Sequence, residues 1–128
     1  MRVEVSLMNH PFHEKPVWPG LDGIAAAARH AEDVGFDGVL VPEAGGHDPF
    51  FPLLIAAANT RRISLRTGIA VAFPRSPMVM AQIAWDLQRF SDGRFELGLG
   101  TQVKGQNERP YAAPWTAPPG PRLREYIL

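Results

Sequence analysis

Side chains that can exchange protons or form hydrogen bonds gather in two segments of the chain. Glu43 and His47 lie four positions apart in a glycine-containing segment, and carboxylate and imidazole groups are common proton carriers in catalysis. Thr101, Gln102 and Asn107 follow the sequence Gly-Leu-Gly and offer hydroxyl and amide groups. Structural roles stay open, because Glu43 also fits a solvated loop carboxylate or a partner of a helix dipole, and His47 fits a structural residue beside a helix cap.

Other kinds of chemistry are disfavoured by the composition. The chain has no cysteine, which excludes disulfides, thiolate metal sites and cysteine nucleophiles. His10 and His13 share one loop, but no carboxylates at metal-ligand spacing accompany them, so we expect no metal site. Thirteen Lys and Arg residues balance thirteen Asp and Glu residues, and this neutrality favours neither a nucleic-acid partner nor a membrane-surface partner.

The pattern of apolar residues also bears on where in the cell the protein lies. Apolar runs such as 53–58 are far shorter than the roughly 20 residues of a membrane span. The N-terminal sequence carries Glu4 inside its first apolar segment and has no small-residue cleavage site, which argues against a secretory signal. We therefore expect a cytoplasmic protein.

The chemistry-bearing segments lie within an alternation of strands and helices. Leu21, Ile24, Ala28 and Ala31 recur at helical spacing, and Gly35 suits the C-terminal stop of that helix. Cap-plus-proline pairs predict two further helix starts, at 48–49 and 76–77. The predicted strands are 2–8, 37–42, 63–71 and 94–100, and the predicted helices are 21–34, 49–60, 77–90 and the short start 122–128. Residues 101–121 contain five prolines and are predicted as a loop.

Strands that alternate with helices predict a parallel sheet with right-handed crossovers. In such a fold the loops after the strands meet at one edge, and we expect Glu43, Gly68 and Thr101 to converge on one shared hollow there. Two architectures fit this pattern: an open doubly wound sheet, and the first half of a (β/α)8 barrel, which needs about 250 residues to close. Either way, residues 1–128 form one domain at most.

Four segments, in order and at matching spacing, resemble the bacterial luciferase-like superfamily: 35–43, 63–70, 75–82 and 93–100. That superfamily comprises flavin-dependent monooxygenases and oxidoreductases that use the deazaflavin coenzyme F420. The resemblance implies a (β/α)8 barrel about twice as long as this chain. Residues 1–128 would then be the N-terminal portion of a luciferase-like domain, a truncated half barrel of four parallel strands with flanking helices.

Two stretches, 43–50 and 98–105, are most similar to an F420-dependent subgroup. The resemblance therefore implies coenzyme F420 as the cofactor, with FMN as the alternative, and hydride transfer to or from a small organic substrate. An alternative is that the chain is a non-catalytic fragment that must associate with another chain to complete a barrel.

The resemblance also implies roles for individual residues. In F420-dependent relatives an acidic residue at the position of Glu43 contacts the deazaflavin, and Ala44 stands where some relatives have a catalytic histidine. His47 is the candidate substitute, so the catalytic candidates are Glu43 and His47. In many relatives a cis peptide bond at the position of Gly68 and Ile69 makes a bulge that supports the ring. The alternative is an ordinary trans peptide, with Gly68 easing the curvature of the strand. The cofactor-binding candidates are Glu43, Gly68, Ile69, Thr101, Gln102 and Asn107.

A half barrel has consequences for association and for cofactor binding. It leaves two parallel sheet edges and one sheet face uncovered, and such surfaces promote association. We therefore expect a homo-oligomer. The phosphate site of such barrels is built after strands seven and eight, so we expect the chain alone to bind its cofactor weakly.

Overall fold

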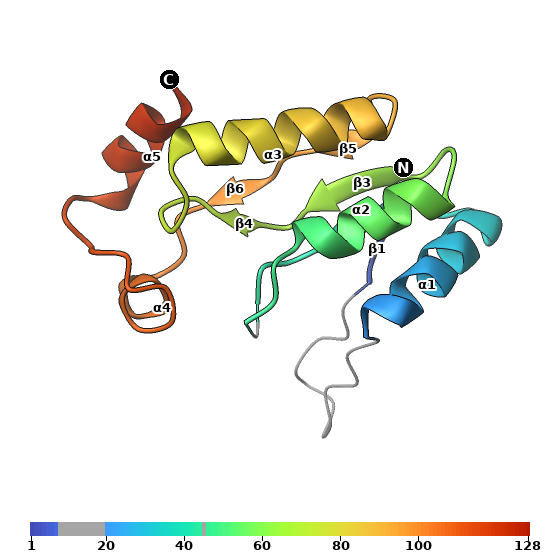
Figure 1. Cartoon of the computed structure of the whole chain (residues 1–128), viewed down its shortest axis with the longest axis horizontal. Helices are drawn as coiled ribbons and strands as arrows, with labels where there is room; N and C mark the ends of the chain where they lie inside the picture. Colours follow the sequence, from blue (N-terminus) through green and yellow to red (C-terminus); the bar gives the residue numbers. More distant parts are fainter. Residues whose placement is uncertain (8–19, 45) are drawn as a thin grey trace.

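The computed structural model describes residues 1–7, 20–44 and 46–128 (Figure 1). A parallel four-stranded sheet has the order β1-β2-β3-β5, and β4 pairs in parallel with β6. The predicted parallel arrangement is therefore confirmed. The strands are β1 Glu4–Ser6, β2 Gly38–Val41, β3 Ser64–Thr67, β4 Ala70–Val71, β5 Phe95–Glu96 and β6 Leu99–Gly100. His10 and His13 lie outside the described residues.

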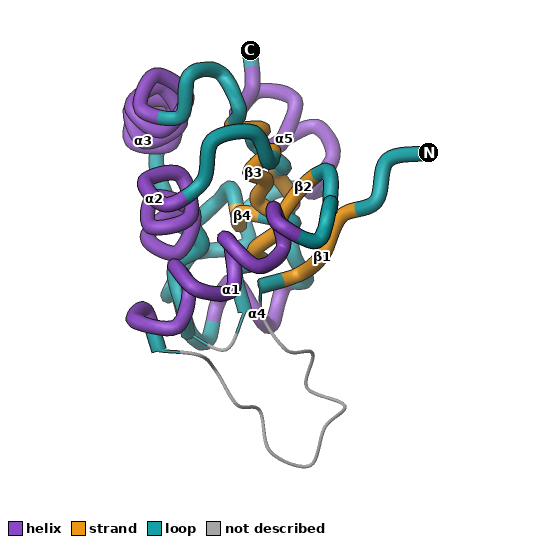
Figure 2. The backbone as a smooth tube through the Cα atoms, turned by 90° about the vertical axis from the view of Figure 1, so that its right-hand side faces the viewer, coloured by secondary structure: helices purple, strands orange, loops and turns teal. Residues whose placement is uncertain are grey.

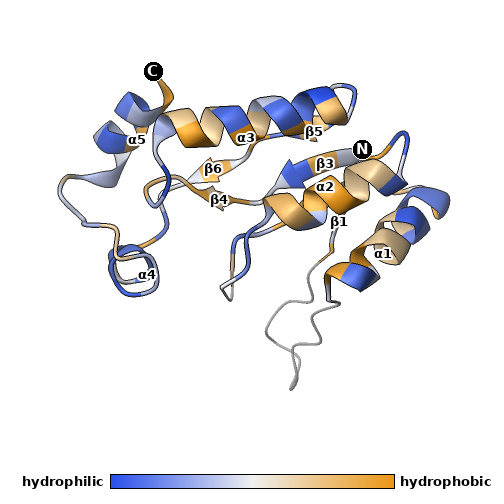
Figure 3. Cartoon of the chain, in the orientation of Figure 1, coloured by the Kyte–Doolittle hydropathy of each residue, from blue (hydrophilic) through white to orange (hydrophobic). Residues whose placement is uncertain are grey.

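The three longest helices form one layer on one face of the strands (Figure 2). They are α1 Leu21–Asp33, α2 Phe50–Asn59 and α3 Pro77–Phe90. Val39, Leu65 and Phe95 share one register row of the sheet and are buried. Apolar residues predominate along α2, whereas apolar and polar residues alternate along α1 and α3 (Figure 3). This difference is expected because α2 lies between the other two helices and contacts both.

The opposite face of the sheet carries four charges of alternating sign. Arg2 contacts Glu4 at 3.0 Å and Glu96 at 2.6 Å. Arg66 contacts Glu4 at 3.3 Å and also pairs with Glu96. The charges therefore balance within the network, and this face is polar and partly exposed.

Two of the predicted strands are divided in the structure. The predicted strand 63–71 consists of β3 and β4, separated by Gly68 and Ile69, whose peptide bond is cis. Here the last residue of β2 and the chain that follows it are the partners: the Gly68 amide donates to the Val41 carbonyl at 2.9 Å, and the Glu43 amide donates to the Ile69 carbonyl at 3.0 Å. The predicted strand 94–100 is likewise divided into β5 and β6.

The prediction of a loop over 101–121 is wrong in two places. Residues Lys104–Glu108 form the short helix α4, and α5 spans Pro119–Ile127 instead of beginning at Arg122. Prolines suit the first turn of α5, because the amide hydrogens that they lack have no intrahelical partner at that position. None of the helices among the described residues is long and apolar enough to cross a membrane.

Glu32 joins the end of α1 to the chain that enters β3. Its carboxylate accepts hydrogen bonds from the backbone amides of Arg61, Arg62 and Ile63 at 2.6–3.2 Å. Burial by itself raises the pKa of Glu32, but these three amides outweigh it and hold the pKa below its ordinary value of 4.5.

A carboxyl group whose pKa is lowered on folding stabilises the folded state above its unfolded pKa and loses that contribution as the pH falls. We therefore expect the free energy of unfolding to decline below about pH 5, and Glu32→Gln to flatten that decline. Urea denaturation at a series of pH values measures both. Asp33→Asn is the matched control, since Asp33 is exposed on the same helix, and an equal flattening in this control would contradict the assignment.

Candidate active site

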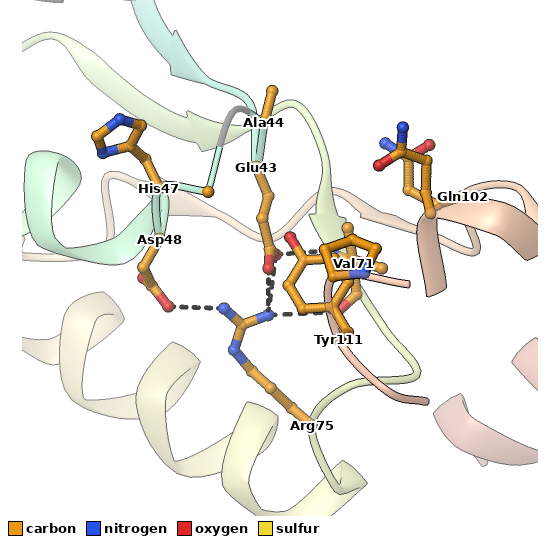
Figure 4. Close-up of a pocket in the computed structure, with 11 residues that line it drawn as sticks. Glu43, Ala44, His47, Asp48, Val71, Arg75, Gln102 and Tyr111 are labelled. Carbon is orange, nitrogen blue, oxygen red and sulfur yellow. Dashed lines mark hydrogen bonds and ion pairs between the residues drawn. The ribbon is translucent and has the colours of Figure 1, made fainter. Parts of the chain in front are cut away.

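A pocket lies where the polypeptide leaves the carboxyl ends of several strands (Figure 4). Its volume is about 510 Å³. Glu43 enters it after β2, Val71 from the end of β4, and Gln102 after β6. The carboxyl ends of strands are where parallel α/β folds build their ligand sites.

Glu43 is buried at the base of this pocket, with 4% of its surface exposed. Its Oε2 accepts a hydrogen bond from the Val71 amide at 2.7 Å, and both carboxylate oxygens accept from Nη1 of Arg75 at 2.8 and 3.0 Å. These contacts fix the end of β2 against the end of β4. They make Glu43 a positioning group, because its oxygens are already engaged by the protein.

Arg75 links three segments of the chain. Besides Glu43, its Nη1 donates to the Val71 carbonyl at 3.3 Å, and its Nη2 donates to Oδ2 of Asp48 at 2.6 Å. Oδ1 of Asp48 accepts from the Phe50 amide at 2.8 Å and so caps the start of α2. Burial by itself lowers the pKa of Arg75, but hydrogen bonds and attraction from the two carboxylates raise it overall.

Tyr111 reaches the same carboxylate from the segment between α4 and α5. Burial is the largest cause that raises the pKa of Tyr111, followed by the charge of Glu43 and a hydrogen bond to Glu43, and the pKa reaches about 12. The phenol is therefore neutral at physiological pH and serves as a hydrogen-bond donor. Tyr111 thus lies beside Glu43 in the pocket wall.

The structure brings together three of the predicted site residues. Glu43, His47 and Gln102 line the pocket, although they come from two distant parts of the sequence. Gly68 and Ile69 are not among the lining residues, but the Ile69 carbonyl accepts a hydrogen bond from the amide of Glu43, which is one of them. Their peptide bond is cis, as the resemblance implied.

Thr101 and Asn107 are not among the residues that line the pocket. Asn107 is 1% exposed, and its Nδ2 donates to the carbonyls of Thr101 and Val103 at 2.8 and 3.1 Å. The Thr101 hydroxyl donates to the Gln102 carbonyl at 3.1 Å. In this structure both side chains form hydrogen bonds within the turn into α4, and their contact with a cofactor ring stays a prediction.

Several residues of the pocket wall were not predicted from the sequence, among them Asp48, Arg75 and Tyr111. Asp48 was interpreted only as a helix cap. In the structure it accepts a hydrogen bond from the Phe50 amide at the start of α2 and also from Arg75 in the pocket wall. Arg75 lies in the predicted loop after the third strand, and an arginine in that loop was the available signal. Tyr111 had no comparable signal, because its contact depends on the path of the segment after β6.

No metal centre accompanies the pocket in the described part of the chain. Within residues 1–7, 20–44 and 46–128, no group of three or more His, Asp or Glu side chains is placed to hold a metal ion.

Comparison with known proteins assigns the chain to a family. The chain matches the luciferase-like monooxygenase family over residues 1–128. The chain belongs to that family. The oxygenating component of 3,6-diketocamphane monooxygenase from Pseudomonas putida, in complex with FMN, superposes with a TM-score of 0.82 at 19% identity, covering 99% of this chain and 38% of that one. The fold predicted for residues 1–128 is therefore confirmed as part of a luciferase-like barrel.

Two relatives from Mycobacterium tuberculosis (strain ATCC 25618 / H37Rv) are similar in sequence. The uncharacterized protein Rv1360 is 50% identical over 103 residues, which cover 80% of this chain and 30% of the relative. Rv3520c, named as a coenzyme F420-dependent oxidoreductase, is 38% identical over 97 residues, which cover 76% of this chain and 28% of the relative. The chain thus spans less than a third of the length of these luciferase-like relatives.

Proposed function

We propose that the pocket is part of the active site of a coenzyme F420-dependent oxidoreductase that transfers hydride to or from a small organic substrate. The observation that carries this proposal is that Glu43, His47 and Gln102 line one pocket beyond the carboxyl ends of β2, β4 and β6. Family membership and the 38% identity to a protein named as F420-dependent support the choice of cofactor.

The pocket fits a heteroaromatic ring in size and in chemistry. Its volume of about 510 Å³ lies within the roughly 300–1,000 Å³ of small-molecule sites. Gln102 and Gln106 are exposed in its wall, and their amides offer donors and acceptors to ring carbonyl and nitrogen atoms. When bound, the deazaflavin ring supplies the hydride chemistry. The residues Glu43, Arg75 and Tyr111 hold the wall of the pocket in place.

A fluorescence titration of the chain with F420 and with FMN tests this proposal. We expect F420 emission to change at lower concentrations than FMN emission, with weak binding overall. If neither signal changes at high micromolar cofactor, the proposed function is wrong for this chain. FMN is the second candidate, because the FMN complex named above shares the fold, and a stronger response to FMN would favour it.

A variant of Gln102 tests, in the same titration, whether its side chain contributes to cofactor binding. Its backbone φ is +54°, so Gln102→Gly removes the amide side chain and keeps the backbone relaxed. Loss of one such hydrogen bond, worth about 1 kcal/mol, is expected to weaken cofactor binding about fivefold. Gln82→Ala, on the exposed face of α3, is the control. Equal affinities for all three proteins would contradict a role for Gln102.

We further propose a cytoplasmic location and self-association, with a non-catalytic barrel fragment as the alternative to the enzyme. Among the described residues the four-stranded sheet ends at β1 and β5, and such parallel edges support association. Size-exclusion chromatography tests this point. A strictly monomeric chain over a wide concentration range would contradict self-association.

A further inference from the structure

Helix α2 is apolar on both its inner and its outer face. None of its ten residues, Phe50–Asn59, is charged. Leu53 is buried in the core, whereas Phe51, Leu54 and Ala58 are exposed. These three follow each other at intervals of three and four positions, which places them on one side of the helix. A helix that is apolar all round is normally covered on every side, so the outer face of α2 is suited to a partner.

A groove with a volume of about 470 Å³ lies beside this face, between α2 and α3. Phe51 and Leu54 of α2 line one side of it, and Ile83, Leu87 and Phe90 of α3 line the other. The outer surface of the helix layer, which Figure 3 shows, therefore carries an apolar ridge and an apolar groove next to each other. Helices pack by placing the ridge of one in the groove of another.

The exposed apolar surface around the groove is large enough for a dimer. Six large apolar side chains of α2 and α3 are 43–67% exposed: Phe51, Leu54, Met78, Val79, Trp85 and Phe90. Since an aromatic side chain has roughly 150–250 Å² of surface, these six together offer on the order of 600 Å². A stable interface buries about 800 Å² per partner, and its core is mostly apolar.

The chemistry of this surface favours a second copy of the chain as the partner. The same face supplies both the ridge and the groove, which is what a twofold interface between identical chains requires. The surface also carries little free charge. Asp48 is already held by Arg75 and by the Phe50 amide, and Asp86 is the other carboxylate of the groove. Cores depleted of charged residues are typical of protein interfaces.

The groove and the candidate active-site pocket share a wall. Asp48 lines both of them. Phe50 lines the groove, and the centre of its ring lies 5.4 Å from the guanidinium carbon of Arg75, which in turn holds Glu43 in the pocket. A chain seated in the groove would therefore contact the outer side of the residues whose inner side forms the pocket.

We propose that a second copy of this chain seats its α2 in the groove between α2 and α3, through a twofold interface, and that this docking stabilises the pocket wall built by Asp48, Arg75 and Glu43. The proposal goes beyond the proposed function, because it concerns a surface outside the pocket and holds whichever cofactor binds. The surface also differs from the sheet edges at β1 and β5, so variants can distinguish the two routes to association.

Sedimentation velocity of the full chain over a wide concentration range tests the docking. We expect a reversible monomer–dimer equilibrium that Leu54→Glu weakens at least tenfold, because a charge would replace an apolar side chain in the interface. Leu21→Glu is the control, since Leu21 is 54% exposed at the start of α1 and does not line the groove. A strictly monomeric parent chain, dimers that persist in Leu54→Glu, or equal weakening in both variants would overturn the proposal.

Hydrogen exchange tests the effect on the pocket wall. The Phe50 amide donates to Asp48 at 2.8 Å, and the Val71 amide donates to Glu43 at 2.7 Å. At a concentration tenfold above the dimer dissociation constant, we expect both amides to exchange about tenfold more slowly than in Leu54→Glu, because docking stabilises the closed wall by mass action.

The Ala113 amide is the internal control for this exchange measurement. It donates to the Asn107 carbonyl at 3.0 Å, and Ala113 lines neither the pocket nor the groove. Unchanged exchange at Phe50 and Val71, or equal slowing at Ala113, would overturn the proposed effect on the wall. Neither experiment uses a cofactor, so their failure is distinct from a failure of the F420 titration, which bears on the proposed function alone.

Discussion

Replacement of Glu43 by alanine is expected to lower the free energy of unfolding by about 3–5 kcal/mol, the usual cost of leaving a buried charge without its partner. Arg75 would lose its contacts with both carboxylate oxygens, and the Val71 amide would lose its acceptor. Asp48 would still contact Nη2 of Arg75, which places the expected loss toward the lower end of the range. Urea denaturation with a linear extrapolation measures it.

Glu108→Ala is the control for this prediction, because it makes the same chemical change in an exposed ion pair. Glu108 lies 3.8 Å from Lys104, with side chains that are 41% and 63% exposed. Surface pairs of this kind contribute about 0–1 kcal/mol. Equal losses of unfolding free energy in the two variants would show that the buried contact between Glu43 and Arg75 is worth no more than a surface ion pair. Glu43 would then not organise the pocket.

Gly98→Ala is expected to cost roughly 1–3 kcal/mol, near the upper end of that range. A Cβ atom at this position would lie 2.2 Å from the carbonyl oxygen of Thr67. That oxygen belongs to the backbone, so the strands themselves would have to move apart. The Gly98 amide and carbonyl also exchange hydrogen bonds with the Thr67 hydroxyl at 2.8 Å, and these bonds would lengthen.

Thermal and urea denaturation, with Gly105→Ala as the control, test the Gly98 prediction. An added Cβ at Gly105 meets no atom within 4 Å, and this glycine lies in helix α4. Alanine is the better helix former by about 1 kcal/mol, so this control is expected to be neutral or slightly stabilising. If Gly98→Ala were equally harmless, the close approach of β3 to the segment between β5 and β6 would be in error.

Helix starts and the parallel pairing of the strands were predictable because they depend on short-range signals. The Ser76-Pro77 pair predicted the start of α3, and the structure has the Ser76 hydroxyl accepting from the Val79 amide at 3.3 Å. Glu43, Gly68 and Thr101 were expected to converge because each lies in or after a strand of a parallel sheet, and of these three Glu43 lines the pocket. Such inferences use only the local periodicity of the sequence and the common direction of parallel strands.

The features that escaped prediction depend on contacts between distant segments. The place of Tyr111 in the pocket wall depends on the path of the chain after β6. The partnership of Arg75 with Glu43 joins loops 32 positions apart. No local pattern encodes any of these pairings.

The central claim is that the pocket of Glu43, His47 and Gln102 receives the redox ring. The most direct measurement is a map of backbone amide shifts in the ¹⁵N-labelled chain as F420 is added. The account predicts that the changes concentrate at Glu43, Val71 and Gln102. Changes confined to the apolar groove between α2 and α3, around Phe51 and Phe90, or spread evenly over the chain, would contradict it.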